Sequence, residues 1–326
     1  MPPNNENYNG IAKDPRTDEQ KAEDYIHEDL AMGEIQLNWI DRDLKNIKTY
    51  PIQNQDGSLS CVAQAVAKLL AIHEVREGRE YKRLCPKIPY DYRSNYPEGG
   101  MWLPNALSIA CKIGTCIEEM LPCDMKNEAF MNDKSLIRAE MINNALNYRG
   151  LYYFEIKSRN IDEIAKINEQ NYGVLLGFRF DRDEWTDVPF VKPNSKLEVG
   201  HGVAETDYFL YKNEKSCNID DSWGPEYGKG GTRIITQTFL DARCFYAGYI
   251  TSLPNYQFVK TLRKGSKGID VKMLQQFLNT QGYALAVDGK FGFYTGLAVE
   301  NFQRKHDLVD DGIVGPKTNK VINSLQ

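Results

Sequence analysis

Three features are scarce or absent in this 326-residue chain, and each absence argues against a class of protein. No apolar stretch approaches the roughly 20 residues that a membrane-spanning helix needs. Residues 1–24 are polar where a signal peptide would have an apolar segment. We therefore expect no membrane span, no signal peptide and synthesis in the cytoplasm. No run of Lys and Arg is long enough to follow a phosphate backbone, and the net charge is -5, so nucleic acid is not an expected partner.

Cysteine is present but lacks the pattern of a metal site. The seven cysteines form an odd set without CxxC spacing, so neither a complete disulfide framework nor a zinc site is predicted. We expect no metal, no cofactor and at least one free thiol. Histidine is scarce, with four in the chain, which shortens the search for a catalytic partner of a thiol.

Composition divides the chain into four segments. A polar leader occupies residues 1–35. The main domain, residues 36–252, holds all the cysteines and most aromatic residues. A linker follows at 253–261, and residues 262–326 contain short helical patterns separated by glycine turns. The 41% hydrophobic content is enough for a full-sized core and a second module.

The last segment contains an internal repeat. "DGKFGFYTGLAVENFQ", from Asp288, and "DGIVGPKTNKVINSL", from Asp311, share Asp-Gly-x-apolar-Gly-x-x-Thr followed by a helical pattern. The glycines permit a tight turn, and Thr295 and Thr318 are expected to N-cap the next helix. Ahead of them, "DVKMLQQFLNTQGY" carries an apolar helical stripe. The segment therefore predicts a small three-helix bundle.

This bundle resembles the peptidoglycan-binding domain type 1 family over about residues 260–326. The doubled DGxxG turn, the "LQQFLN" helix and the "AVENFQ" helix occur in the family's order. The resemblance implies a wall-binding module without catalytic activity, with bacterial peptidoglycan as its partner. The alternative is an unrelated bundle that only packs on the main domain.

A candidate nucleophile lies in "QNQDGSLSCVAQAVAKLL", residues 53–70, where a polar loop turns into an apolar helix. The helix after Cys61 is apolar on nearly all sides, so it should be buried. A cysteine in the first turn of a helix is close to the positive end of the helix dipole, which favours the thiolate. The alternative is that Cys61 is only a small core residue.

A thiolate nucleophile needs an imidazole nearby, and elimination leaves one histidine. His73 is on the same helix, roughly 18 Å away along its axis. His27 is in the polar leader, and His306 follows "FQRK" at a helix end. His201 remains, between two glycines that allow close approach of another chain segment. Asp221 can orient its ring, and Trp223 can shield that hydrogen bond from water.

Four segments resemble the papain (C1) cysteine peptidase family, in the family's order. "NQDGSLSCVA" resembles its nucleophile loop, "YPEGGMWLPNAL" its glycine pair beside the substrate cleft, and "DDSWGPEYGKGGTRI" its NSWG segment. "LNWIDRDLKNIKTYPIQNQ" resembles the lead into the active-site loop. The resemblance covers about residues 36–250. It implies a papain-like two-lobed α+β fold, with a helical lobe and a β-barrel-like lobe, followed here by the three-helix bundle.

The resemblance also implies roles for individual residues. Cys61 falls on the nucleophile and His201 on the base that takes its proton. Asp221 falls on the orienting asparagine, and Gln55 on the oxyanion-hole glutamine. The simpler alternatives are a surface turn acid for Asp221 and a solvated loop residue for Gln55. Substrate-binding positions are expected at Gly99, Gly100, Met101, Trp102, Gly202 and Trp223.

The chain departs from the family pattern at several positions. Val62 replaces a tryptophan after the nucleophile, and Ser58 and Pro97 stand where the family has two bridged cysteines. Loss of that bridge suits folding in a reducing cytoplasm. Asp221 in place of asparagine should raise the pKa of His201. The leader is short for an inhibitory propeptide, so self-inhibition is not predicted.

These observations predict a monomeric cysteine endopeptidase that a wall-binding module carries to the bacterial cell wall. Tethering raises the local substrate concentration. A lytic enzyme, endolysin or autolysin-like, would cut the peptides of peptidoglycan, whether phage-encoded or exported without a signal peptide. A wall-docked protease would cut proteins instead. A third reading is a catalytically silent wall-binding structural or virion protein.

Overall fold

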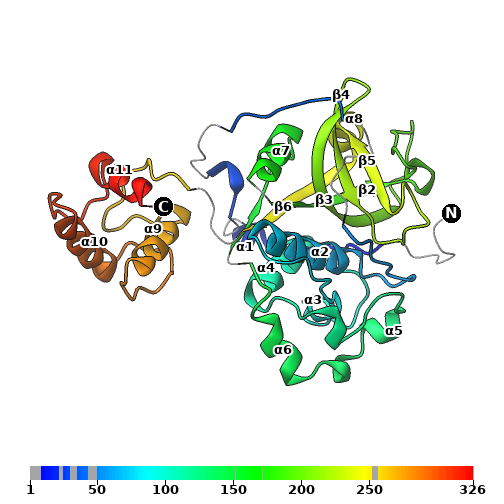
Figure 1. Cartoon of the computed structure of the whole chain (residues 1–326), viewed down its shortest axis with the longest axis horizontal. Helices are drawn as coiled ribbons and strands as arrows, with labels where there is room; N and C mark the ends of the chain where they lie inside the picture. Colours follow the sequence, from blue (N-terminus) through cyan, green and yellow to red (C-terminus); the bar gives the residue numbers. More distant parts are fainter. Residues whose placement is uncertain are drawn as a thin grey trace. The chain divides into compact units, whose positions relative to one another are not determined.

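The computed structural model describes residues 9–21, 25–29, 35–42, 50–150, 152–170, 172–251 and 256–325. Its contacts divide the chain into two compact units (Figure 1). The larger unit comprises Met1–Asp24 and Ile35–Leu253, and the smaller comprises Tyr25–Glu34 and Pro254–Gln326. Parts of the predicted leader, and residues 253–255 of the predicted linker, lie outside the described residues.

The helical part of the larger unit is built around α2 (Cys61–Arg76). This segment lacks glycine and proline and is rich in alanine, which favours a helix. Residues 61–74 are all buried, because α2 packs against the sheet and is also covered by α3 and by α4, which itself contacts β1 (Tyr152–Glu155) and β6 (Cys244–Thr251) (Figure 1). The remaining helical elements of this unit are α1 (Asp18–Lys21), α3 (Lys87–Asp91), α4 (Leu103–Lys112), η3 (Glu118–Met120), α5 (Glu128–Met131), η4 (Lys134–Leu136), α6 (Ala139–Ala145), α7 (Ile161–Glu169), η5 (Arg182–Glu184) and α8 (Gln237–Arg243).

A disulfide that the cysteine spacing did not predict joins Cys85 to Cys123 in the helical part. It closes a segment with a sequence separation of 38 residues, and such a cross-link stabilises mainly by restricting the unfolded chain. The free cysteines among the described residues are Cys61, Cys111, Cys116, Cys217 and Cys244.

The β part is a six-stranded antiparallel sheet with the order β1-β6-β2-β3-β4-β5. Its strands are β1 (Tyr152–Glu155), β2 (Val174–Phe180), β3 (Val199–Tyr211), β4 (Glu214–Asp220), β5 (Thr232–Thr236) and β6 (Cys244–Thr251). Among these described strands, β1 and β5 pair on one side only. The sheet is therefore open, and the barrel-like closure expected from the sequence is wrong. The mixed helix-and-sheet architecture itself is as predicted.

The strand register brings residues that are distant in sequence together near the first residues of β3. His201 pairs with Phe178 of β2, and Ala204 pairs with Asp220 of β4. Because antiparallel partners run in opposite directions, the residues that follow Asp220 lie alongside His201. α2 packs against β3, so the start of that helix also reaches this region.

The smaller unit contains α9 (Ile269–Thr280), α10 (Phe293–Lys305) and α11 (Pro316–Ser324), with the short turn η1 (His27–Asp29). The sequence repeat forms two matching hydrogen-bond networks. Gln275 donates to Asp288, to the Lys290 carbonyl and to Thr295, and accepts from the Gly289 N–H. Gln303 makes the same set with Asp311, the Ile313 carbonyl, Thr318 and the Gly312 N–H.

These networks explain why the predicted threonine N-caps are wrong. The N-cap residues of α10 and α11 are Gly292 and Gly315. Thr295 and Thr318 lie three residues inside their helices and are buried, where each hydroxyl accepts a hydrogen bond from a glutamine amide. The predicted sequence repeat is therefore confirmed as a structural repeat. Its threonines, however, hydrogen-bond to the glutamines that hold the turns and do not cap the helices.

The smaller unit also includes residues that the sequence assigned to the leader and to the linker. Tyr256 and Phe258, inside the predicted linker, are buried, and the Phe258 N–H donates to Asn323 of α11 at 2.8 Å. Tyr25, inside the predicted leader, lies under the Lys272 ammonium group. The exact domain boundaries stay predictions. None of the helices in the described parts of the chain is long and apolar enough to span a membrane.

Candidate active site

Cys61 is the first residue of α2, as the sequence predicts, and its side chain is buried. The backbone N–H of Gly202 donates to the Cys61 Sγ at 3.4 Å. A Cβ at position 202 would lie 2.8 Å from Val62 Cγ2, so this close approach of β3 to α2 requires glycine. The helix start and this N–H both stabilise negative charge on the sulfur.

His201, beside the thiol, is paired with a carboxylate. Its Nε2 is 2.7 Å from Asp221 Oδ1, and the backbone N–H of the next residue, Gly202, contacts the Cys61 Sγ. Burial alone would lower the pKa of His201, but Asp221 and Cys61 raise it from 6.5 to about 9. The imidazole is therefore held as a cation at neutral pH, as the aspartate in place of asparagine suggests.

Asp221 is buried and accepts hydrogen bonds from several groups besides His201. Its Oδ2 accepts from Arg233 Nε at 2.8 Å and from Trp185 Nε1 at 3.0 Å, and its Oδ1 accepts from the Ser222 N–H at 2.8 Å. Burial would raise the pKa of Asp221, yet His201 and Arg233 hold it well below its usual range. Arg233 thus balances the charge that this aspartate introduces.

Two tryptophans enclose the His201–Asp221 hydrogen bond. The ring centroid of Trp223 lies 4.8 Å from that of His201, and Trp185 stands nearly perpendicular at 5.6 Å. Both tryptophans are almost completely buried. Because water is excluded, the ion pair acts at low dielectric and is stronger than it would be in solvent.

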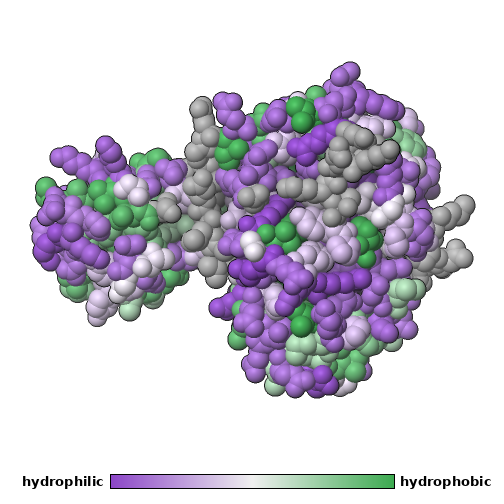
Figure 2. All heavy atoms as spheres, viewed as in Figure 1, coloured by the Kyte–Doolittle hydropathy of each residue, from purple (hydrophilic) through white to green (hydrophobic). Residues whose placement is uncertain are grey.

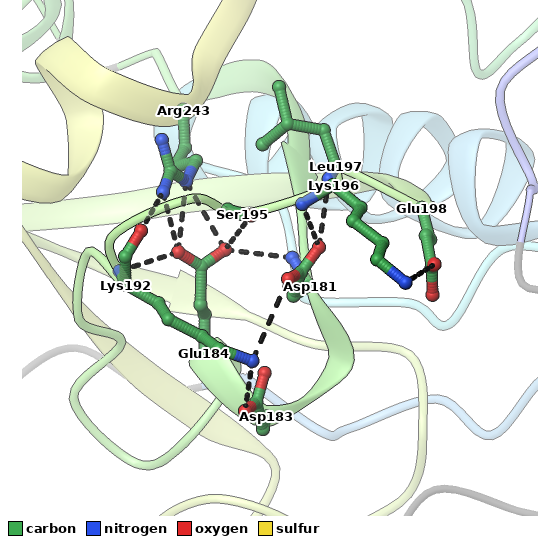
Figure 3. Close-up of polar contacts among 9 residues, drawn as sticks. All are labelled: Asp181, Asp183, Glu184, Lys192, Ser195, Lys196, Leu197, Glu198 and Arg243. Atoms are coloured by element: carbon green, nitrogen blue, oxygen red, sulfur yellow. Dashed lines mark hydrogen bonds and ion pairs between the residues drawn. The ribbon is translucent and has the colours of Figure 1, made fainter.

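A buried carboxylate anchors the loop that carries Trp185 (Figure 3). Glu184 pairs with Arg243 at 2.6 Å and accepts from the N–H groups of Asp181 and Lys192 and from the Ser195 hydroxyl. Burial would raise the pKa of Glu184, but these donors lower it to about 2. The network fixes the chain next to Trp185, and so supports the indole that donates to Asp221.

Gln55 is buried beside this site. Its Oε1 accepts from the Ser222 hydroxyl at 2.6 Å, its N–H donates to the Ser222 carbonyl at 2.9 Å, and its side-chain amide donates to the Ser58 carbonyl. Two of these contacts join Gln55 to the residue next to Asp221. The predicted oxyanion-hole role stays a prediction.

Beneath the site, α2 and β4 are joined by a buried ion pair. Lys68 Nζ is 3.2 Å from Asp220 Oδ2, and both side chains are almost fully buried. Burial raises the pKa of Asp220 to about 6, opposed by Lys68. This pair holds the helix that carries Cys61 against the strand that precedes Asp221.

The N-terminal segment passes directly over the thiol. Gly10 is buried, and a Cβ at this position would overlap the Cys61 Sγ. The segment makes parallel bridges, Asn9 with Gly200 and Ile11 with Met101. The Gly10 carbonyl accepts from the Met101 N–H at 2.9 Å, and the Ala12 N–H donates to the Met101 carbonyl at 3.1 Å. An extended strand of the chain itself therefore occupies the space in front of Cys61.

Three of the predicted substrate-binding positions, Gly100, Met101 and Gly202, contact this strand or the thiol. A Cβ at Gly100 would lie 2.9 Å from the Asn9 carbonyl oxygen, and the Arg16 guanidinium lies 4.2 Å from the centre of the Trp102 ring. A Cβ at Gly99 would instead overlap Leu59. Sequence reasoning missed the path of residues 9–12, and no pattern in this polar segment indicates it.

Sequence reasoning also missed Arg233, Trp185 and Glu184. Arg233 lies in "GTRIIT", within a segment already matched to the papain family, so a search for the counter-charge of Asp221 would have found it. Trp185 and Glu184 carry no such signal. Among the residues that the structure describes, no group of three or more His, Cys, Asp or Glu side chains is arranged to hold a metal ion.

Comparison with known protein families identifies the smaller unit. Residues 267–322 match the family described as "Putative peptidoglycan binding domain". The zinc D-Ala-D-Ala carboxypeptidase of Streptomyces albus G is 42% identical over 76 residues, 22% of this chain and 29% of that protein. The spore cortex-lytic enzyme of Bacillus cereus is 41% identical over 64 residues, 19% of this chain and 25% of that protein. The chain thus spans less than a third of the length of these relatives.

Solved structures define the class of fold. Xylellain, a cysteine protease from Xylella fastidiosa, superposes with a TM-score of 0.62 at 16% identity, covering 76% of this chain and 97% of that one. Procathepsin L 3 of Tenebrio molitor larval midgut gives 0.54 at 15% identity, covering 75% and 76%. ProCathepsin B S9 from Trypanosoma congolense gives 0.56 at 12% identity, covering 74% and 85%.

The chain therefore has the papain-like cysteine protease fold. It combines this fold with a C-terminal domain of the peptidoglycan-binding family.

Proposed function

We propose that this protein is a cysteine endopeptidase that hydrolyses peptide bonds through an acyl-enzyme on Cys61. The observation that carries the proposal is the buried cluster of Cys61, His201 and Asp221 at the start of α2. His201 is hydrogen-bonded to Asp221, and the N–H of the residue after His201 donates to the Cys61 Sγ. A thiol at a helix N-terminus, beside an imidazole that a carboxylate holds cationic, is the arrangement that thiolate catalysis requires.

Each residue of the site then has a role in a step of the hydrolysis. The Cys61 thiolate attacks the carbonyl carbon of the scissile bond, and the Cys61 N–H and Gln55 stabilise the oxyanion. The His201 imidazolium gives its proton to the leaving amine, which leaves an acyl-thioester. Neutral His201 next takes a proton from water, which attacks the thioester and releases the acid and the thiolate. Asp221 keeps the ring oriented, and Arg233 balances its charge.

The smaller unit would bring this activity to the bacterial cell wall. Its support is the family match over residues 267–322 and partial likenesses to wall-related enzymes. We favour a lytic enzyme, endolysin or autolysin-like, that cuts the peptides of peptidoglycan as a monomer. A wall-docked protease that cuts proteins is the second candidate, because the larger unit shares its fold with cysteine proteases.

Removal of the nucleophile tests this function. Wild-type chain and Cys61→Ala are incubated with purified peptidoglycan and with a denatured protein, and new amino termini are scored by mass spectrometry. We expect new termini from peptidoglycan that fall by at least about 10³-fold in Cys61→Ala, since the other residues cannot form the acyl-enzyme. Cys111→Ala, which removes another free thiol, is the control and should retain activity.

The outcomes separate the candidates. New termini from the wall identify a lytic endopeptidase and the bond that it cuts. New termini from protein alone indicate the wall-docked protease. Wall binding without cleavage of either substrate would contradict the enzyme and favour the silent structural or virion protein.

A further inference from the structure

We propose that a groove between the two Asp-Gly turns of the smaller unit binds the peptide stem of peptidoglycan. This inference rests on the proposed wall targeting and adds the surface that performs it. The groove has a volume of about 400 Å³, which is within the range of small-ligand sites. Its walls include apolar Phe291, Phe293 and Leu297, and charged Arg263, Lys264 and Glu300. Asp311 also lines it, but its carboxylate already accepts hydrogen bonds from Gln303 and from the Ile313 N–H.

The floor of the groove contains a glycine that the packing of the unit does not require. Gly296 lies within α10, where glycine destabilises a helix relative to alanine. Its φ is not in the left-handed region. A Cβ there would meet only Phe291 Cε1, at 3.7 Å, an ordinary contact. A larger side chain at this position would instead fill the groove, so the glycine keeps the groove open.

The charges around the groove fit a zwitterionic ligand. Arg263 and Lys264 supply cationic groups, and Glu300 on α10 supplies an anionic one. Within the described parts of the chain, none of these three side chains makes a hydrogen bond or ion pair. A stem peptide carries carboxylates and can carry a free amine, whereas the N-acetylated sugars of a glycan without stems carry the lactyl carboxylates of muramic acid but no amine, so only the stem supplies both charges. Charge complementarity therefore favours the stem.

The groove is bordered by exposed apolar side chains. Phe293 is 67% exposed and Tyr294 is 75% exposed, and their rings contact each other at 5.6 Å. Figure 2 shows hydrophobic side chains on the surface of this unit. Large exposed apolar groups beside a groove are typical of interaction sites, and here they can contact the alanine methyl groups of a stem.

The test uses the full chain with Cys61→Ala, so that the wall is not consumed. Binding is measured by co-sedimentation with purified peptidoglycan and by calorimetry with a soluble disaccharide-peptide. Adding Gly296→Leu should weaken both by at least tenfold while Tm stays the same or rises, because a helix glycine is removed. Lys320→Leu, an exposed helix position outside the groove, is the matched control and should bind normally.

Arg263→Gln and Glu300→Gln provide a second test that does not depend on Gly296. Each should weaken binding of the disaccharide-peptide with no change in Tm. Normal binding in Gly296→Leu and in both charge variants would overturn the groove but leave wall targeting intact. Equal affinity for glycan stripped of its stems would overturn the stem as ligand. Failure of the Cys61→Ala parent to bind the wall would overturn both proposals.

Discussion

Gly10→Val is expected to raise kcat/KM for peptide hydrolysis by about tenfold or more. The added Cβ would overlap the Cys61 Sγ, so residues 9–12 cannot stay in the cleft. A substrate must otherwise compete with a segment tethered at high effective concentration, and its apparent affinity falls with the fraction of open sites. If the substitution destabilises the closed state by about 1.4 kcal/mol relative to the open one, the ratio of open to closed chains rises tenfold.

Initial rates over a range of substrate concentrations test this prediction. Pro15→Ala is the control, because Pro15 is exposed and lies outside the strand pairing. It should leave the rate unchanged. An unchanged or lower rate in Gly10→Val, with Tm near that of the wild type, would contradict occupation of the cleft in solution.

The Asp221–Arg233 pair should control the pH profile, with opposite effects from its two partners. Asp221→Asn removes the charge that raises the pKa of His201 to about 9. The alkaline limb of kcat/KM, where the imidazolium is lost, should therefore move down by about 1 to 3 pH units. Arg233→Met removes the cation that shares the Asp221 carboxylate with His201. The carboxylate then stabilises the imidazolium more strongly, so the pKa of His201 rises and the alkaline limb should move to higher pH.

The free energy of unfolding should also depend on pH through the ion pair between His201 and Asp221. The pKa of His201 is higher in the folded chain than its ordinary value of 6.5. Its stabilisation is therefore complete below about pH 6.5 and is lost as the pH rises through about 9. Urea unfolding at pH 6 and pH 9.5 should show this loss in the wild type and a smaller one in Asp221→Asn.

Breaking the buried pair carries its own cost. Either single variant leaves a buried charge uncompensated and should lower the free energy of unfolding by roughly 3 kcal/mol at pH 7. The double variant Asp221→Asn/Arg233→Met should recover part of this. Arg304→Met, which breaks an exposed pair with Asp310, is the control and should change little. Additive effects in the double variant, or alkaline limbs that move in the same direction, would contradict the coupling.

The central pair of the site could be predicted because its signals are local. Cys61 stands where a polar loop meets an alanine-rich helix, and α2 begins at that residue. With four histidines in the chain, elimination left His201, which does interact with Cys61. The C-terminal repeat could be predicted for the same reason, since its turns depend on glycines that are close in sequence.

The rest depends on contacts that only the folded chain creates. Arg233 reaches Asp221 from β5, and Trp185 reaches it from the residue after η5. Arg233 lies in a segment that the sequence already pointed to, whereas nothing in the spacing indicates Trp185. The path of Gly10 over Cys61 follows from bridges to Gly200 and Met101, which lie far apart in sequence. Seven cysteines allow many pairings, and the Cys85–Cys123 bridge could not be chosen among them.

The measurement that tests the account most directly is the rate at which each free thiol is alkylated. The wild type and Gly10→Val are treated with iodoacetamide at pH 7, and the labelled cysteines are mapped by mass spectrometry. Burial raises the pKa of Cys116 to about 11 and those of Cys111 and Cys244 to about 12, and raises the pKa of Cys217 well above its usual value. Cys61 should be labelled first in both chains, and faster in Gly10→Val. Labelling of Cys61 no faster than these four thiols in Gly10→Val would contradict its assignment as the nucleophile.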